Sequence, residues 1–487
     1  MIQAELKPTV QLKEHGLIHH PGREEKFNVD KFRNNLKIVV IKSAETLEFD
    51  LIGVDCSFAN AIRRILIAEV PSVSIERVYL SQNTSVLPDE VLCHRLGLVP
   101  LTIDPKCLSY PSKPLPSTDE ISEFIPSEHI VFDFKLQFNK SDLKAESRRS
   151  TNEVSADPQV STVRSMPVYS SELKWVPLPG QSEMFGEKNL PTVVSKSILL
   201  NKLTVGDELE ARCVAVKGTG RDHAKFSPVS AAFYKFMPII RLLRPIEGDE
   251  ARLLQKCFAQ GVIGIDEKTD QAYVLDPRFD NGSREHMRHP NFREQSIFVG
   301  MNPNHCIFSV ESLDPDHRPP ARLVRSAIEV MIEKCKHYLA ITAKPEFGEK
   351  ANERAAQVNS IPDQKHIETE NSSGTKSQLN GREVGLEVTN MTSDKSRVTY
   401  TFYGEDHTLG LALRFCVLQC TKATFCGYCV PHPLEDKIHF DVQIKNGNAH
   451  DILREGLQIL LECFCCIKAE FKRALSEYKQ QMKIEQD

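Results

Sequence analysis

A strand, a glycine turn and a helix follow one another at residues 47–70, and this segment constrains the fold more than any other part of the chain. It begins with an alternation of apolar and polar side chains, which predicts a half-buried strand. Gly53 ends the alternation, and Asp55 follows where a carboxylate can cap a helix by accepting hydrogen bonds from free backbone N–H groups. Apolar residues then recur at helical spacing and predict one buried helix face: Phe58, Ile62, Ile65 and Leu66.

The same pattern returns near the other end of the chain, at residues 398–417. Gly404 lies 351 positions after Gly53, and Asp406 lies 351 positions after Asp55, since 404 − 53 = 406 − 55 = 351. The apolar helix positions of this second copy are Leu409, Leu413 and Cys416. Each copy is followed by another predicted strand and helix. A unit present twice indicates an internal pseudo-dimer in which the two apolar helix faces meet, although each face could also lie in the core of its own unit.

Both helix starts, FANAIRRIL at 58–66 and HTLGLALR at 407–414, resemble the dimerisation motif of the alpha subunits of RNA polymerases. Residues from about 30 to 339 resemble the larger alpha-like subunit shared by eukaryotic RNA polymerases I and III, and residues 398–475 resemble its smaller partner. The chain therefore looks like a fusion of the two. Two further stretches carry the resemblance: TSVLPDEVLCHRLGLVPL at 84–101 and VKGTGRDHAKFSPVS at 216–230.

The resemblance implies an α+β fold with two alpha-type dimerisation units, each strand-helix-strand-helix, the first interrupted by an inserted mixed α/β domain. A stretch rich in Asn, Ser, Glu and Lys predicts a flexible linker, which at roughly 40 residues reaches about 35 Å root-mean-square. Pairing could occur within one chain or between two. The predicted parts are an N-terminal tail at 1–35, the first unit at 36–75 and 301–342, the insert at 76–300, the linker at 343–385, the second unit at 386–475 and a C-terminal tail at 476–487.

The resemblance implies a non-catalytic assembly subunit of DNA-directed RNA polymerases I and III, which make ribosomal RNA precursors, 5S ribosomal RNA and transfer RNA. The paired units would form a platform for the largest and second-largest subunits, with small zinc-binding subunits nearby and DNA contacted only indirectly. A nuclear location that includes the nucleolus follows from this, and no apolar run approaches the ~18–20 residues of a membrane span.

Two other functions stay open from the sequence. One is the equivalent alpha-like pair of RNA polymerase II or of an archaeal polymerase, and the other is a nucleic-acid-binding module. The net charge of −5 disfavours the second, because a protein that mainly coats nucleic acid is expected to be basic.

Residues outside the apolar faces are candidates for docking the large subunits. Arg63 and Arg64 lie off the stripe of the first helix, where an arginine fork would suit an interface and a solvated helix face is the alternative. A glycine-rich loop holds the other candidates: Lys217, Gly218, Gly220, His223 and Lys225. That loop lacks the spacing of a P-loop or a dinucleotide fold, so a tight turn with positive-φ glycines is its alternative reading.

Cys426 and Cys429 form a C-x-x-C pair, but structural zinc usually needs four ligands. The other candidate ligands, Cys463, Cys465 and Cys466, lie in a predicted helix that turns them to different faces. We interpret these cysteines mainly as small packing residues, expected to be reduced, with zinc as the alternative. The first half lacks the zinc-loop cysteines of the polymerase II subunit, which favours the polymerase I and III version. We predict no catalytic residue, no metal site and no cofactor, since neither a carboxylate cluster nor a cofactor motif occurs.

Overall fold

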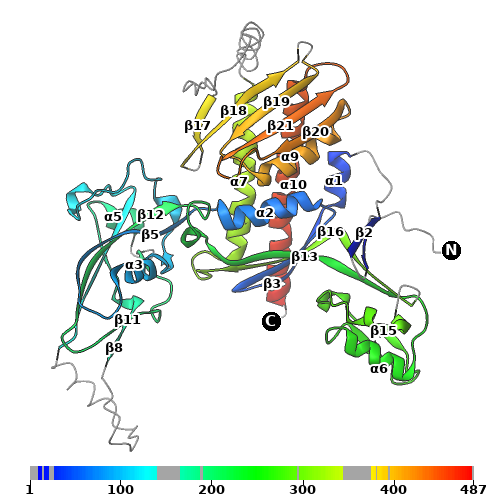
Figure 1. Ribbon diagram of the computed structural model, residues 1–487, viewed down its shortest axis with the longest axis horizontal. Coiled ribbons are helices and arrows are strands. Elements are labelled where there is room, and N and C mark those ends of the chain that lie inside the picture. Colours follow the sequence, from blue (N-terminus) through cyan, green and yellow to red (C-terminus); the bar gives the residue numbers. More distant parts are fainter. Residues whose placement is uncertain are drawn as a thin grey trace, which may run out of the picture.

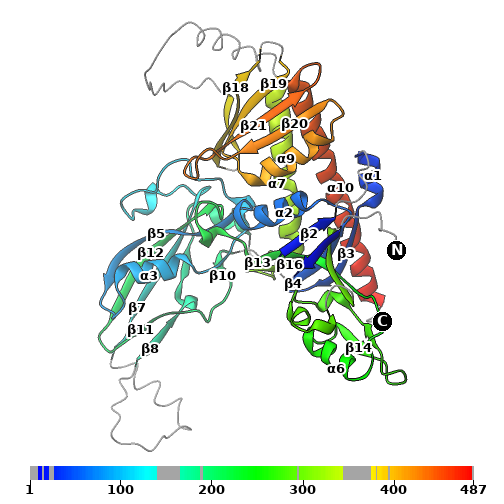
Figure 2. The same cartoon turned by 45° about the vertical axis from the view of Figure 1, so that its right-hand side comes forward.

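The computed structural model of the chain describes residues 9–13, 16–20, 27–139, 165–186, 190–292, 296–343, 375–379, 381–392 and 395–484. Two units stack on each other, and a layer of helices lies between their sheets (Figure 1). Two further lobes project from this central body, as the turned view also shows (Figure 2).

The first unit is an antiparallel sheet with two helices packed on it. Its elements are β1 (Thr9–Lys13), β2 (Gly16–His20), β3 (Lys37–Ser43), β4 (Thr46–Ile52), α2 (Cys56–Ala68), β13 (Val229–Leu242), β16 (Ile297–Ser312) and α7 (Pro320–Thr342). The strand order is β2-β1-β16-β4-β3, and β13 also pairs with β16. Phe49 of β4 lies opposite Phe308 of β16, and their rings stack with centroids 4.9 Å apart. This pair closes one layer of the core beneath the helices.

The second unit repeats this plan with a five-stranded sheet. Its elements are β17 (Thr375–Leu379), β18 (Arg382–Met391), β19 (Arg397–Tyr403), α9 (His407–Gln419), β20 (Ala423–Cys429), β21 (Lys437–Ile444) and α10 (Ala449–Ile484). The strand order is β17-β18-β19-β21-β20, and every neighbouring pair is antiparallel. In β21 the buried residues alternate strictly with half-buried ones, as a strand with one covered face requires.

The two copies keep the predicted register along the whole repeat. Strand β19 has the bounds of β4 shifted by 351 (397 − 46 = 403 − 52 = 351), and α9 has the bounds of α2 shifted by 351 (407 − 56 = 419 − 68 = 351). Asp55 caps α2 by accepting the N–H of Ser57 at 2.8 Å, and Asp406 caps α9 by accepting the N–H of Thr408 at 2.8 Å. The predicted fold class of two alpha-type dimerisation units is confirmed.

The glycine that separates strand from helix is required in both copies. Gly53 has φ of 80° and Gly404 has φ of 73°, a left-handed conformation that a side chain disfavours. A Cβ on Gly53 would also lie 2.3 Å from the carbonyl oxygen of Asn35, the last residue of α1 (Val29–Asn35). The turn therefore lets the chain reverse while another backbone passes close beside it.

One apolar core contains both units. Helix α2 contacts α9, α7 contacts α10, and buried side chains from both halves form a single continuous cluster. The four helices lie between the two sheets in both views (Figures 1 and 2). The halves are thus joined through a shared interior, which is the arrangement of one folded body.

The structure divides the insert predicted at 76–300 into two lobes with separate cores. The larger lobe has its own apolar core, and its elements are β5 (Ser72–Asn83), α3 (Asp89–Gly97), β6 (Leu101–Thr102), β7 (His129–Gln137), β8 (Met166–Tyr169), β9 (Lys174–Val176), α5 (Gln181–Phe185), β10 (Thr192–Val193), β11 (Leu199–Leu203) and β12 (Glu208–Gly218). The smaller lobe has a separate core and contains α6 (Gly248–Cys257), β14 (Ile263–Ile265) and β15 (Ala272–Val274). Between the two lobes in sequence, β13 returns to the first sheet. This 14-residue strand pairs with β16 along its length.

The structure also shows regular elements within the segments predicted as tails and linker. The N-terminal tail at 1–35 contains α1 and the hairpin of β1 and β2, with Val10 opposite Met301 of β16. The linker at 343–385 ends in β17 and the start of β18, and the C-terminal tail continues α10 as far as Ile484. Most residues of these segments are polar, and β1 also depends on pairing with the distant β16, so local composition did not reveal the strands. No helix in the described part of the chain has both the length and the apolar character needed to cross a bilayer.

Candidate interfaces

The predicted dimerisation residues lie at the centre of the shared core. Each of the seven is at most 1% exposed, and all belong to the cluster that contains both halves: Phe58, Ile62, Ile65, Leu66, Leu409, Leu413 and Cys416. Their helices also bury side chains against their own sheets, as α2 does against β13 and β16. The structure therefore brings these residues together in one interior, with contributions from both kinds of packing that the sequence allowed.

Aromatic rings make direct contacts across the two halves. The Phe58 ring lies 5.6 Å from Phe415 and 5.5 Å from Phe464, both in the second unit. In the other direction, Tyr338 of α7 lies 5.0 Å from Phe402 of β19. Offset and edge-on ring pairs at these distances stabilise an interior beyond their buried area, so the halves are held by specific contacts as well as by burial.

Arg64, one of the residues predicted to dock a large subunit, contacts the second unit of the same chain. Its guanidinium donates to Oδ2 of Asp406 at 3.0 Å and to Oγ1 of Thr408 at 2.9 Å. Burial alone would raise the pKa of Asp406, but hydrogen bonds from Thr408 and the charges of Arg64 and Arg221 lower it to about 2. The carboxylate of Asp406 thus caps α9 and also accepts a hydrogen bond from Arg64 of α2. Arg63 instead donates to Asn60 of its own helix.

The glycine-rich loop reaches the boundary between the halves through a residue that the sequence did not single out. Arg221 donates to the carbonyl oxygen of Gly404 and to Oδ1 of Asp436, each at 2.9 Å. Its backbone N–H donates to the carbonyl of Ala68 at the end of α2. A Cβ on Gly220 would lie 2.0 Å from the carbonyl oxygen of Ile67, so only glycine lets the loop approach this closely.

The other predicted docking residues of this loop are mostly engaged within the chain. Lys217 donates to the carbonyl of Leu108, and a Cβ on Gly218 would lie 2.8 Å from the Phe226 ring. Lys225 donates to the carbonyl of Ile75 and pairs with Glu76 at 2.6 Å, whereas Nδ1 of His223 accepts the N–H of Lys225 and its ring stays exposed. Lys217, Gly218, Gly220 and Lys225 therefore have structural roles in this fold, and His223 is the one that faces solvent.

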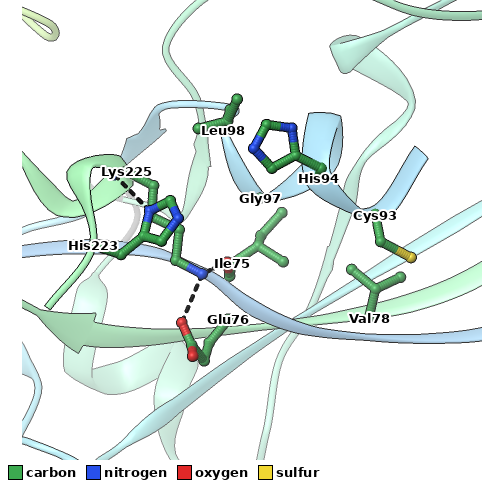
Figure 3. Close-up of a pocket in the computed structure, with 9 residues that line it drawn as sticks. All are labelled: Ile75, Glu76, Val78, Cys93, His94, Gly97, Leu98, His223 and Lys225. Atoms are coloured by element: carbon green, nitrogen blue, oxygen red, sulfur yellow. Dashed lines mark hydrogen bonds and ion pairs between the residues drawn. The ribbon is translucent and has the colours of Figure 1, made fainter. Parts of the chain in front are cut away.

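His223 and Lys225 line a cavity of about 240 Å³ against α3 (Figure 3). Its lining is Ile75, Glu76, Val78, Cys93, His94, Gly97, Leu98, His223 and Lys225. Both stretches that carried the resemblance inside the insert, 84–101 and 216–230, thus contribute to one surface hollow. Leu98 is 49% exposed at its rim, which gives the hollow an apolar edge beside charged and imidazole groups.

A buried ionic cluster joins the halves, and sequence reasoning missed it. Nζ of Lys334 in α7 lies 2.8 Å from Glu405 of the second unit and 2.7 Å from Glu69 at the end of α2. The hydroxyl of Tyr338 donates to the second oxygen of Glu405 at 3.0 Å. A signal did exist, because Lys334 interrupts the apolar stripe of a helix whose neighbouring turns are buried.

The ionisation of this cluster follows from its burial. The Lys334 side chain is 5% exposed and the Glu405 side chain is not exposed at all. Burial disfavours the ammonium, but the charges of Glu405 and Glu69 outweigh this and raise the pKa of Lys334 above its ordinary value. Burial raises the pKa of Glu405, which the nearby Lys334 only partly offsets. The lysine is therefore held as a cation between two carboxyl groups.

The cysteine pair does not form a metal site with the residues around it. On β20, Cys426 is buried and Cys429 is exposed, since residues three apart on a strand point to opposite faces. On α10, Cys463 is buried and Cys465 is exposed. In the ranges that the structure describes, no group of three His, Cys, Asp or Glu side chains could hold a metal ion. All fourteen cysteines, which lie within those ranges, are free thiols.

The fold and the paired core define a class of protein. The family model of the RNA polymerase Rpb3/Rpb11 dimerisation domain matches residues 48–335, and a second model with the same description matches residues 397–468. The chain belongs to the family of RNA polymerase subunits that carry this domain, and it carries the domain twice.

Particular relatives agree with the polymerase I and III version. The chain is 42% identical over 291 residues to DNA-directed RNA polymerases I and III subunit RPAC1 of Saccharomyces cerevisiae, covering 59% of this chain and 83% of that protein. It is 36% identical over 324 residues to the Homo sapiens subunit of the same name, covering 66% and 88%. To subunit 3 of RNA polymerases II, IV and V of Arabidopsis thaliana it is 31% identical over 300 residues, covering 59% and 85%. The resemblance identified from the sequence is confirmed.

Proposed function

We propose that this chain is a non-catalytic assembly subunit of RNA polymerases I and III. The observation that carries the proposal is the single core in which two alpha-type units pair within one chain. The names of the yeast, human and other relatives support polymerases I and III, and the weaker identity to the polymerase II, IV and V subunit supports that choice over the alternative. Catalysis would remain with the large subunits.

The paired units would serve as a preformed platform. The seven core residues described above would hold the pair together by burial, and the Arg64–Asp406 and Lys334–Glu405 contacts would fix its orientation. Because both units share one polypeptide, each would meet the other at a high effective concentration, on the order of millimolar or below. The large subunits would then assemble on a surface that needs no prior association step.

We place the docking surface on the larger lobe, around the cavity between α3 and the glycine-rich loop. His223 is exposed there, and Leu98 in the lining is 49% exposed, which gives an apolar contact point with charged neighbours. Interfaces commonly combine an apolar centre with a polar rim. Arg63 on α2 would be a second docking point. Small zinc-binding subunits would dock nearby, DNA would be contacted only indirectly, and the protein would work in the nucleus, including the nucleolus.

Affinity purification of the tagged native protein, with intact mass and subunit identification, tests the function. We expect one species near 55.0 kDa together with the largest and second-largest subunits of polymerases I and III. Two species near the sizes of the halves, with the same large subunits, would keep the function and discard the single chain. Large subunits of polymerase II alone would favour the alternative pair. Recovery of no polymerase subunit would refute the proposal.

A variant tests the docking surface separately. Leu98→Ser combined with His223→Ala should lower recovery of the large subunits while changing the melting temperature little, because both side chains are exposed and His223 makes only one hydrogen bond to a neighbouring backbone N–H. The matched control is Leu434→Ser, a residue 89% exposed on the second unit. Equal recovery with both variants would remove the docking surface from the larger lobe while leaving the assembly function in place.

A further inference from the structure

The closing helices of the two units can be aligned position by position. A shift of 129 residues places eight buried positions of α7 on eight buried positions of α10, since 452 − 323 = 467 − 338 = 129. The α7 positions are 323, 324, 327, 328, 331, 334, 335 and 338, and the α10 positions are 452, 453, 456, 457, 460, 463, 464 and 467. Helix α2 contacts α9 and α7 contacts α10, as a two-fold pairing of like units requires.

The alignment shows that the ionic cluster occupies only one side of this pseudo-symmetric interface. Glu405 corresponds to Val54 and Glu69 to Cys420, because 405 − 54 = 420 − 69 = 351. Lys334 corresponds to Cys463 and Tyr338 to Ile467 through the shift of 129. The four corresponding residues are buried and apolar: Val54, Cys420, Cys463 and Ile467. One side of the interface therefore contains charged groups, and the side related to it by the pseudo-symmetry is apolar.

We infer that Glu405 is a pairing-specificity residue: it prevents the second unit from pairing with a copy of itself and selects the first unit, which brings Lys334 and Tyr338. In a self-pair of the second unit, each Glu405 would face the positions of Cys463, Cys420 and Ile467, where no cation or donor is available. A buried carboxylate left without its partner is strongly unfavourable, and here the loss would occur twice. This inference rests on the pairing in the proposed function and not on which polymerase the pair serves.

The penalty against self-pairing is larger for the second unit than for the first. In a self-pair of the first unit, Lys334 would keep Glu69, which comes from the same unit, and Tyr338 would lose its acceptor. One lost hydrogen bond is a smaller penalty than an unpaired buried charge. Two chains that exchanged halves would form the same cluster, so Glu405 selects the kind of partner and leaves open which chain supplies it.

The test uses the full chain with a protease site placed between α7 and β17, cut after purification so that both halves remain together. After incubation, native mass spectrometry counts hetero-pairs and self-pairs. Wild-type protein should give only the pair of first and second halves. Glu405→Val, which restores the residue type of Val54 and leaves Lys334 paired with Glu69, should give at least about tenfold more second-half self-pairs. Glu477→Val is the matched control, because Glu477 is exposed on α10.

Two results of this experiment would overturn the inference: self-pairs in the wild type at the level of the variant, or none with Glu405→Val. A reciprocal pair of variants in the uncut chain keeps the question decidable if the first variant folds poorly. Val54→Glu should lower the unfolding temperature, and adding Cys463→Lys should restore at least about half of the loss, since it recreates the ion pair on the apolar side. Absence of any rescue counts against the inference. Because these readouts measure pairing alone, a purification without polymerase subunits would refute the proposed function and not this inference.

Discussion

Replacing Lys334 with methionine should strongly destabilise the paired core. Its ammonium has two carboxylate contacts, at 2.7 and 2.8 Å, and at an effective dielectric of about 20 each attraction is roughly 6 kcal/mol before desolvation. Desolvation of the three groups offsets most of this. Removing the cation alone leaves two carboxyl groups facing each other in the interior, and breaking a buried ion pair in this way typically costs about 3–5 kcal/mol.

Differential scanning calorimetry of the full chain measures this effect. For a cooperative core of the size of the two units together, about 3–5 kcal/mol corresponds to a melting temperature roughly 6–20 °C lower. The difference in melting temperature between wild type and Lys334→Met should be larger at pH 8 than at pH 5. In the variant, burial raises the pKa of Glu405 with no cation to offset it, so the folded chain binds a proton at lower pH and gains stability there.

A double-mutant cycle decides whether the two halves are coupled through this contact. Lys334→Met combined with Glu405→Val should destabilise the core by about 1–3 kcal/mol less than the sum of the single changes, because the second change removes the carboxylate that the first left unpaired. Additive effects, or a shift below about 1 kcal/mol for Lys334→Met alone, would refute the reasoning.

Three further predictions follow from the same core. Phe58→Ala should cost about 3–5 kcal/mol of stability because the ring contacts both halves, whereas Phe233→Ala, 54% exposed, should change the melting temperature little in the same calorimeter. Asp406→Asn keeps a capping oxygen but loses the charge. Since the pKa of Asp406 is about 2, below its ordinary value of 3.8, its ionised form stabilises the fold above about pH 4 and this contribution, at most about 2 kcal/mol, is lost as the pH falls toward 2. Denaturant unfolding at pH 7 and pH 3 should therefore show a smaller gap between wild type and variant at pH 3, and a constant gap would contradict the assignment. Finally, a thiol reagent should label Cys429 and Cys465 first in the native protein, and equally fast labelling of a buried thiol such as Cys416 would contradict its burial.

The repeat was predictable because it is written in local signals. The alternation before Gly53, the positive φ that the turn requires and the carboxylate that caps the helix each act within a few residues of sequence. The offset of 351 then carried the assignment of β4 and α2 onto β19 and α9 without error at any of the four bounds. The apolar stripe of Phe58 to Leu66 was visible for the same reason.

The docking loop shows where such reasoning stops. Its residues are basic and glycine-rich, which suggested a surface for a partner, yet Lys217 and Lys225 bond to carbonyl groups of their own lobe. Position 220 requires glycine because the end of α2 lies against it. This backbone contact spans 153 positions (220 − 67 = 153), so the local composition cannot predict it. The division of the insert into two lobes could not be predicted for a similar reason. It depends on β13 pairing with β16, a strand that is distant in sequence.

By itself, the sequence determined two alpha-type units, their register, the caps and turns that start their helices, and the family to which the chain belongs. Only the tertiary structure decided that Arg64 meets Asp406 across 342 positions and that Lys334 meets Glu405 across 71. It also decided that these charges lie on one side of an otherwise symmetric core. The physical reason is that hydrogen-bonded turns and helix faces are short-range, whereas the pairing of buried charges depends on which elements meet when the chain closes on itself.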